Sequence, residues 1–239
     1  LVRNPGEDVN DYDVLQGTLT AGDNYTITYE PALFTINQAL LIITPDVLSK
    51  TYGEADPEFT YQITSGELVG EDGLSGVLVR DAGEDVNSYA VSQGTLTAGI
   101  NYLLTVEPGT FTINPALITV TADNLYKTYG ESDPVLTYQV TSGALVGADG
   151  FSGNLLREPG EDVNTYTISQ GNLTAGGNYS LSFVTGIFAI NPVLITITAD
   201  NQNKTYGESD PELTYQITSG SLVGEDSFTG ELVREEGEN

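Results

Sequence analysis

The sequence contains no cysteine, histidine, methionine or tryptophan. The chain therefore has no disulfide, no thiolate nucleophile, no histidine base and no imidazole metal ligand, and most familiar catalytic centres are excluded. Basic residues are scarce: 7 Lys and Arg stand against 34 Asp and Glu, for a net charge of −27. Such a surface repels nucleic acid and anionic lipid, so neither is an expected partner. Because no hydrophobic run approaches the roughly 18 residues of a membrane span, we expect no membrane insertion by this segment.

An internal repeat dominates what is present. The segment Lys-Thr-Tyr-Gly-Glu begins at Lys50, Lys127 and Lys204, in steps of 77 residues. Gly-Glu-Asp-Val-Asn and the closing Phe-x-Ile-Asn recur in the same register, without insertion or deletion. We therefore divide the chain into four parts. They are the C-terminal half of a repeat (1–38), two complete repeats (39–115 and 116–192) and the N-terminal part of a further repeat (193–239).

The two outer parts are incomplete repeats, so we expect the chain to be an excerpt from a longer array. An alternative stays open, because residues 193–239 of one chain and residues 1–38 of another would together complete one repeat. Chains would then associate head to tail.

Apolar and polar residues alternate with a period of two through residues 116–192, which predicts strands. The expected strands are 117–122, 126–129, 136–142, 154–158, 165–170, 179–184 and 187–191. One face of each is apolar and the other is rich in Thr and Ser, as in half-exposed antiparallel strands. The pattern predicts an all-β fold, a tandem array of 77-residue immunoglobulin-like β-sandwich modules. The alternative is a β-grasp-like module, in which Gly143–Phe151 would form a packed helix.

The number of strands also predicts how repeats are joined. With an odd number of up-and-down strands, the chain enters a repeat at one end and leaves at the other. Asn114-Pro115 and Asn191-Pro192 lead directly into the next repeat, with no Gly/Ser linker and with a stiffening proline. We therefore expect the modules to form an extended rod.

Every basic residue occupies a repeated position. Because cations that recur in an acidic chain indicate fixed carboxylate partners, we predict structural ion pairs for these residues. The predicted members are Lys50, Lys127, Lys204, Arg80 and Arg157. The alternative is an isopeptide bond from Lys127 to Asn114 or Asn191, with Glu131 or Glu161 as the proton shuttle.

Acidic loops suggest a second hypothesis, Ca²⁺ bound between repeats, since Ca²⁺ takes six to eight oxygen ligands. Two sets of ligands are predicted at the joints. They are Asp123, Asn124, Glu208 and Asp210 at one joint, and Asp46, Glu131 and Asp133 at the other. The alternative is that these residues form ordinary solvated turns, because no Asp-x-Asp-x-Asp-Gly loop is present. No other cofactor is expected.

The segments Ile-Thr-Val-Thr-Ala-Asp-Asn, Lys-Thr-Tyr-Gly-Glu, Asn-Tyr and Phe-x-Ile-Asn-Pro, at their spacing in residues 116–192, resemble the MBG domain of the YGX type. The resemblance covers the whole repeat and continues through the chain. Such domains occur as tandem arrays in very large secreted bacterial surface proteins, including the adhesins of gliding bacteria. The resemblance implies an extracellular, cell-surface location and a stalk-forming or adhesive role. It brings no catalytic residues.

Two functions are then in competition. The first is a structural stalk or filament that projects an adhesive region, with neighbouring repeats, and other copies in a filament, as its partners. The second is multivalent weak binding of glycans or surfaces by the repeats themselves, for which Tyr52, Tyr129 and Tyr206 are the best exposed candidates. We expect no enzymatic activity, because pairs such as Glu161 and Asp162 are repeated on small modules without an evident cleft.

Overall fold

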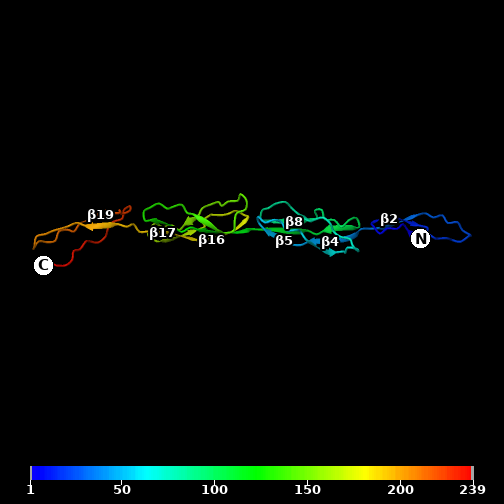
Figure 1. The fold of residues 1–239 in the computed structure, drawn as a ribbon, viewed down its shortest axis with the longest axis horizontal. Helices are drawn as coiled ribbons and strands as arrows, with labels where there is room; N and C mark the ends of the chain where they lie inside the picture. The colour runs from blue at the N-terminus through cyan, green and yellow to red at the C-terminus, as the bar shows by residue number, and fades with distance from the viewer. Residues whose placement is uncertain (1, 238–239) are drawn as a thin grey trace. The chain divides into compact units, whose positions relative to one another are not determined.

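The computed structural model describes residues 2–237, and no helix occurs among them (Figure 1). The chain divides into two compact units, one ending at Ala116 and the other beginning at Leu117. Each unit contains one complete repeat and one partial repeat, and each is described here by itself.

Seven strands form each complete repeat, at the positions that the alternation predicts. In residues 39–115 they are β4 (Ala39–Pro45), β5 (Leu48–Thr51), β6 (Tyr61–Ser65), β7 (Val79–Arg80), β8 (Ser88–Ser92), β9 (Tyr102–Val106) and β10 (Gly109–Asn114). In residues 116–192 they are β11 (Ala116–Ala122), β12 (Leu125–Thr128), β13 (Tyr138–Ser142), β14 (Leu156–Arg157), β15 (Thr165–Ser169), β16 (Tyr179–Val184) and β17 (Gly186–Asn191). The prediction of tandem all-β modules is confirmed.

Each repeat contains two sheets. The orders in residues 39–115 are β6-β4-β9 and β5-β10-β8-β7, and those in residues 116–192 are β13-β11-β16 and β12-β17-β15-β14. Only two residues separate β4 from β5, and two separate β9 from β10, so each of these pairs is one extended segment that crosses between the sheets.

The up-and-down course assumed for the seven strands is wrong. Strand β4 is parallel to β9, β5 is parallel to β10, and β12 is parallel to β17. Ala39 faces Tyr102 in the first sheet and Thr51 faces Asn114 in the second, so one register is kept across both sheets. Because β4–β5 and β9–β10 each make a single pass, a repeat has five passes, still an odd number. The last pass runs in the same direction as the first.

The helix required by the β-grasp alternative is not formed, because Gly143–Phe151 is a loop. The Tyr179 hydroxyl organises this loop. It accepts a hydrogen bond from Val146 N (2.8 Å) and donates one to Asp149 Oδ2 (2.6 Å).

Two clusters of buried apolar side chains fill the interior of residues 39–115. The larger comprises Ile43, Leu78, Val91, Leu96, Phe111 and Ile113, and the smaller comprises Leu41, Ala98 and Tyr102. Phe59 packs edge-on against Phe111, with 5.3 Å between the ring centroids. These side chains alternate with outward-facing Thr and Ser, which accounts for the period of two in the sequence.

Strands form in the partial repeats where a partner strand is available. Residues 2–37 contain β1 (Val2–Arg3), β2 (Asn10–Leu15) and β3 (Ala32–Ile36), and residues 193–237 contain β18 (Thr196–Ala199) and β19 (Tyr215–Ser219). Residues 25–30, at the positions of β16, and residues 202–205, at those of β12, are not in strands. The partners of β16 and β12 have no counterpart in the same partial repeat, so pairing, more than local propensity, decides whether these segments become strands.

Two glycines give a matched test of this packing. Gly76 (φ +89°) and Gly99 (φ +80°) both have left-handed backbone, but a Cβ on Gly76 would collide with the Thr95 carbonyl oxygen, whereas one on Gly99 would meet no atom within 4 Å. We expect Gly99→Ala to cost about 1–2 kcal/mol of stability and Gly76→Ala to cost about 1–3 kcal/mol more. Urea unfolding followed by circular dichroism measures both, and equal losses would contradict this packing.

Candidate functional site

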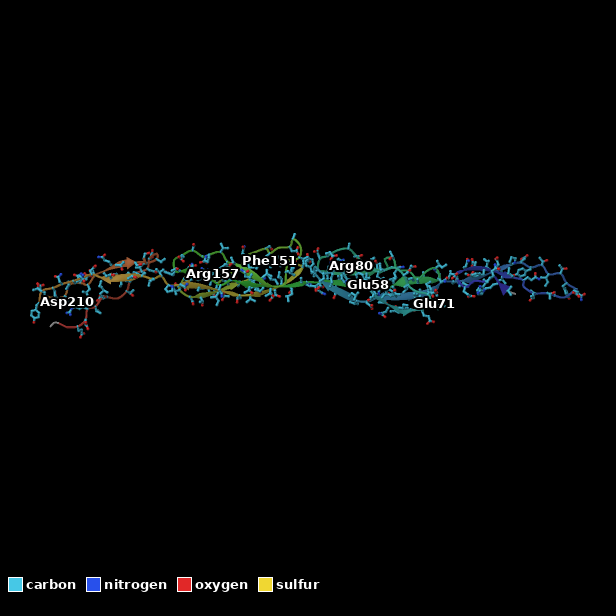
Figure 2. The ribbon with its side chains drawn as sticks, viewed as in Figure 1. Glu58, Glu71, Arg80, Phe151, Arg157 and Asp210 are labelled. Atoms are coloured by element: carbon cyan, nitrogen blue, oxygen red, sulfur yellow. The ribbon has the colours of Figure 1, made fainter. Side chains whose placement is uncertain are left out.

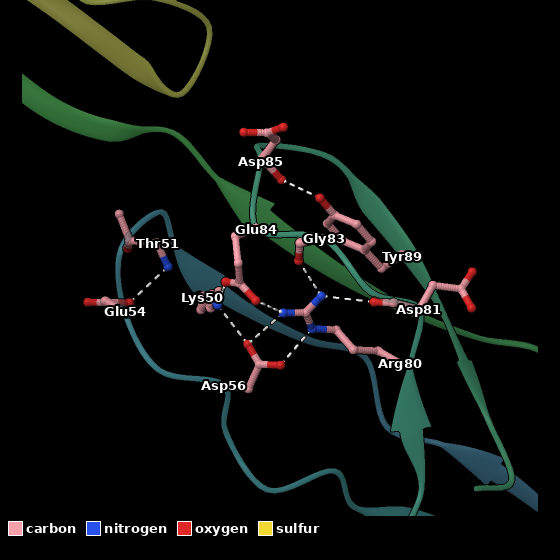
Figure 3. Close-up of polar contacts among 10 residues, drawn as sticks. All are labelled: Lys50, Thr51, Glu54, Asp56, Arg80, Asp81, Gly83, Glu84, Asp85 and Tyr89. Carbon is pink, nitrogen blue, oxygen red and sulfur yellow. Dashed lines mark hydrogen bonds and ion pairs between the residues drawn. The ribbon is translucent and has the colours of Figure 1, made fainter. Parts of the chain in front are cut away.

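The most highly organised polar site in each repeat is a cluster of four charged side chains (Figure 3). In residues 39–115 they are Lys50 on β5, Asp56 in the following loop, Arg80 on β7 and Glu84 in the loop between β7 and β8. Lys50 Nζ lies 2.7 Å from Asp56 Oδ1 and 2.5 Å from Glu84 Oε2. Arg80 Nε lies 2.6 Å from Asp56 Oδ2, and Arg80 Nη2 lies 2.6 Å from Glu84 Oε1. Each carboxylate bridges both cations, and the cluster has no net charge.

Local structure holds these side chains in place. After β5 the chain turns, with Glu54 N donating to Thr51 O and Thr51 N donating to Glu54 Oε2. Pro57 then restricts Asp56 to extended backbone. On the other side, Gly83 O accepts a hydrogen bond from Arg80 Nη1. Gly83 has φ +144°, and a Cβ there would overlap the Tyr89 ring, so this loop requires glycine.

The cations are buried and the anions face water. The side chains of Lys50 and Arg80 are 4% and 7% exposed, whereas that of Glu84 is 67% exposed. The Arg80 guanidinium lies over the Tyr89 and Phe111 rings, at 5.0 and 5.3 Å from their centroids. Since an unpaired buried charge is strongly destabilising, the carboxylates are required to keep the lysine and arginine inside the repeat.

The cluster is complete in the second complete repeat as well and is present in part among the described residues of the partial repeats, and Figure 2 labels one member from each of three copies, Arg80, Arg157 and Asp210. Lys127 and Arg157 both bind Asp133 and Glu161. Lys204 and Arg234 bind Asp210, and Arg3 binds Glu7. The five cations expected in ion pairs, Lys50, Lys127, Lys204, Arg80 and Arg157, therefore all lie in this cluster.

The geometry gives no support to an isopeptide bond at Lys127. Lys127 faces Ile190 in the parallel register, and its amine is engaged by Asp133 and Glu161. Asn191, one of the two candidate acceptors, faces Thr128, and its backbone carbonyl accepts a hydrogen bond from Tyr129 N.

The ion pairs shift the pKa values of the cluster residues in the direction that favours the charged form of each side chain. Arg80, and then Lys50, lower the pKa of Asp56 to about 2. Lys50, and then Arg80, lower the pKa of Glu84, and hydrogen bonds to Asp56 and Glu84 raise the pKa of Lys50. Arg234 and Lys204 likewise lower the pKa of Asp210 to about 2.

The predicted calcium ligands at the first joint have other partners. Asp123 and Asn124 lie at the crossover between β11 and β12, not at the end of the repeat as predicted, because the crossing segment makes one pass instead of two. Asp123 Oδ2 accepts a hydrogen bond from Gln139 Nε2 (3.4 Å), and Asn124 Oδ1 accepts one from Ile187 N (2.8 Å). Glu208 Oε2 accepts a hydrogen bond from Thr205 N, and Asp210 is held by Lys204 and Arg234.

The second predicted set is engaged in the same way within each unit. Glu131 caps the backbone N of Thr128, Asp133 lies in the ion-pair cluster, and Asp46 accepts hydrogen bonds from Gln62. Within residues 2–237 no three acidic side chains are grouped so as to hold a metal ion. Calcium binding therefore stays a prediction without support from these side chains.

Contacts between consecutive repeats occur inside each unit. In the first unit, Asn101 Oδ1 accepts a hydrogen bond from Val9 N (2.8 Å), and Asn101 Nδ2 donates one to Asp8 Oδ1 (2.9 Å). Gln38 Nε2 donates to the carbonyls of Ile100 (3.0 Å) and Tyr102 (3.2 Å). The partial repeat is thus held to the incoming end of the complete repeat, where β4 and β9 begin.

In the second unit the outgoing end of the complete repeat meets the following partial repeat. A Cβ on Gly130 would collide with the Val223 side chain, which shows how closely the two segments pack. A hydrogen bond to Asp226 raises the pKa of the neighbouring Tyr129 phenol. Asn101, Tyr129, Gly130 and Val223 recur at the equivalent positions of other copies, whereas Gln38 is replaced by Pro115 and Pro192, so its hydrogen bonds belong to the first joint alone.

The tyrosines proposed for ligand contact differ in exposure. Tyr52 and Tyr129 are half-buried, and Tyr206 is 90% exposed. The sequence analysis missed Tyr126, which is 74% exposed on β12. It also missed the structural role of Tyr102 and Tyr179, although the recurring Asn-Tyr pair could have indicated it.

The sequence profile of the MBG domain (YGX type) matches residues 41–112, 118–189 and 195–239. The chain belongs to the MBG domain family. MBG repeats are typical of large extracellular surface proteins. No curated protein and no solved structure matches the chain. Among residues 2–237, no helix is long and apolar enough to cross a membrane.

The lowered pKa of Asp56 predicts how MBG repeat stability depends on pH. A carboxylate whose pKa is lower in the folded than in the unfolded state contributes stability that is complete above its unfolded value and is lost as pH falls through the folded value. For Asp56 this window runs from 3.8 down to about 2. Asp56→Asn with Asp133→Asn should lower stability by about 2–3 kcal/mol at neutral pH, because charge-assisted hydrogen bonds are lost.

Thermal unfolding of the full chain at a series of pH values measures this effect. The difference in Tm between wild type and the double variant should be constant down to about pH 4 and narrow toward pH 2. Asp46→Asn with Asp123→Asn, outside the cluster, is the matched control. A difference that persists unchanged at pH 2 would contradict the assignment.

Proposed function

We propose that these MBG repeats are the non-catalytic modules of a stalk or filament, which projects an adhesive region of a large bacterial surface protein away from the cell. The observation that carries this proposal is the parallel register of β4–β5 with β9–β10. Each repeat receives the chain at one end and releases it at the other, travelling in the same direction. Such a module suits serial extension better than closure into a compact particle.

The joints support the same proposal. Strand β10 ends at Asn114 and β11 begins at Ala116, so a single proline separates the strands of consecutive repeats. A joint this short has little freedom, and Pro restricts it further. Inside the first unit, where Gln38 stands in place of this proline, Asn101 adds hydrogen bonds to Asp8 and Val9 across the joint. Joints with little freedom suit an extended stalk better than a flexible chain of modules.

The acidity of the chain supports a filament in solution. With a net charge of −27, neighbouring stalks repel one another, and exposed strand edges are kept from pairing between chains. The lysines and arginines lie in the ion-pair clusters inside the repeats, so they neutralise carboxylates of the same repeat and not those of neighbouring chains. In this proposal the partners of a repeat are its neighbours in the chain, and no cofactor is required.

Multivalent glycan binding by the repeats has weaker support. Avidity through many weak sites needs the same exposed side chains in every copy. The exposed Tyr126 is replaced by Ser49 and Asn203 at the equivalent positions. Tyr52 and Tyr129 are half-buried in the complete repeats. Since no exposed aromatic group is common to the complete repeats at these positions, the stalk is the better-supported function.

Small-angle X-ray scattering of the full chain tests the stalk. The first pass of a repeat, residues 39–51, spans about 43 Å at about 3.3 Å per residue. Repeats of about this length, joined in line, give a radius of gyration of about 40 Å for the whole chain, with a thin cross-section. A compact protein of this size has about 18 Å.

A linker variant provides the matched control for the joints. We expect insertion of a Gly-Ser linker of about ten residues after Gln38 and after Pro192 to lower the radius of gyration, although the chain becomes longer, because flexible joints fold back. A wild-type value near 18 Å, or no decrease in the linker variant, would contradict the stalk.

A further inference from the structure

Tension on a stalk reaches each repeat through two neighbouring segments. In residues 39–115 the chain enters at Ala39, the start of β4, and leaves at Asn114, the end of β10. The incoming segment (39–51) and the outgoing segment (102–114) are paired by five residue pairs in one sheet and four in the other. We propose that this pairing makes each repeat a tension-bearing element, which resists unfolding when pulled along the chain.

The direction of the strands is what gives this resistance. Because the two segments are parallel, pulling the chain ends apart draws them in opposite directions along their common axis. The ladder hydrogen bonds lie across that axis, so they are loaded together and must break together. If the segments were pulled apart from one end, the same bonds would open one at a time, at a lower force.

The ion-pair cluster adds a second link between the paired segments, through side chains, which we call the lateral hold. Strand β5 lies at the edge of its sheet and pairs with β10 alone. Lys50 on β5 reaches Asp56 and Glu84, which in turn hold Arg80, and the Arg80 guanidinium lies over the Phe111 ring on β10. The incoming strand is thus linked to the outgoing strand by hydrogen bonds and also through the buried ion pairs. Sliding of β5 and its following loop along β10 breaks the Lys50–Glu84 and Asp56–Arg80 ion pairs.

The arrangement recurs in the second complete repeat. Strand β12 is the edge strand paired in parallel with β17, Lys127 lies on β12, and Arg157 lies over Phe188 of β17, at 5.0 Å from the ring centroid. Lys127 and Arg157 share Asp133 and Glu161 as Lys50 and Arg80 share their partners. The connection between the incoming and outgoing strands is therefore a property of the repeat and not of one copy.

Single-molecule force spectroscopy of the full chain tests the direction of resistance. Because the chain lacks cysteine, introduced cysteines are unique attachment points. One sample is pulled through handles at the two chain ends. The other carries Ala55→Cys and Pro115→Cys, two exposed positions just beyond the paired Thr51 and Asn114, and is pulled through them.

Pulling through the chain ends loads the parallel pair along its axis, and pulling through positions 55 and 115 opens it from one end. We expect a clearly higher rupture force in the first geometry. Equal forces in the two geometries would overturn the proposal.

The lateral hold is tested by Lys50→Met with Lys127→Met, which keeps the length of the side chain and removes the charge. Pulled through the chain ends under constant force, this variant should unfold about tenfold faster than wild type, since the hold is broken before the strands slide. Leu96→Ala with Leu173→Ala is the matched control, because both leucines are buried in the same cores but lie outside the paired segments.

The leucine variant should lose stability to urea and keep more of its resistance to force than the lysine variant. A lysine variant that loses stability to urea but unfolds under force at the wild-type rate would overturn the role of the cluster. The inference rests on the proposed stalk function, but failure of the inference can be told apart from failure of the stalk. Equal rupture forces with an extended particle in scattering would leave a stalk that does not resist tension, whereas a compact particle would remove the stalk itself.

Discussion

The fixed parallel register between the first and last segments of each repeat is the constraint on which the rest of the structure depends. It runs through both sheets, from Ala39 with Tyr102 to Thr51 with Asn114. Both segments cross between the sheets at the same level, so a crossing segment is complete only where each sheet supplies a partner strand, although the partial repeats still form β1-β2-β3 and β18-β19 alone. The partial repeats illustrate this dependence, because residues 25–30 and 202–205 are not strands where their partners are missing.

The buried cations follow from that arrangement. An edge strand with one neighbour needs a second hold, and in the complete repeats the lysine on that strand supplies it through two shared carboxylates. The aliphatic stem of the lysine packs in the core while its charge is neutralised at the rim. A chain with so few cations places them where a charge can be buried only if it is paired. The excess of acidic residues remains on the surface, where it favours solubility and keeps neighbouring chains apart.

Much of the fold could be predicted from the sequence, because side-chain alternation reports which residues face a core. The alternation located the seven strands of a repeat, and the fixed spacing of the lysines predicted that they form structural ion pairs. Strand pairing could not be predicted in the same way. The predicted strands 117–122 and 126–129 were counted as two passes, as were 179–184 and 187–191, although the chain continues from each first strand into the other sheet. Asp123 and Asn124 were misplaced for this reason.

The partners of the lysines were not predicted, since 34 acidic residues offered too many candidates. Asp56 is distant from Arg80 in sequence and Glu84 is distant from Lys50, and only the fold brings these two pairs together. A signal was nevertheless present. The Asp-Pro and Gly-Glu-Asp segments recur at the same step as the lysines, so the repeated acids were the natural partners of the repeated cations.

Disulfide trapping tests the parallel register most directly. Ser49 on β5 faces Thr112 on β10, and adjacent strands bring such pairs within the 4.4–6.8 Å Cα separation that a disulfide allows. The account predicts that Ser49→Cys with Thr112→Cys forms an intramolecular disulfide on mild oxidation, and that the off-register pair Ser49→Cys with Thr110→Cys does not. Preferential crosslinking of the off-register pair, or none in either, would contradict it.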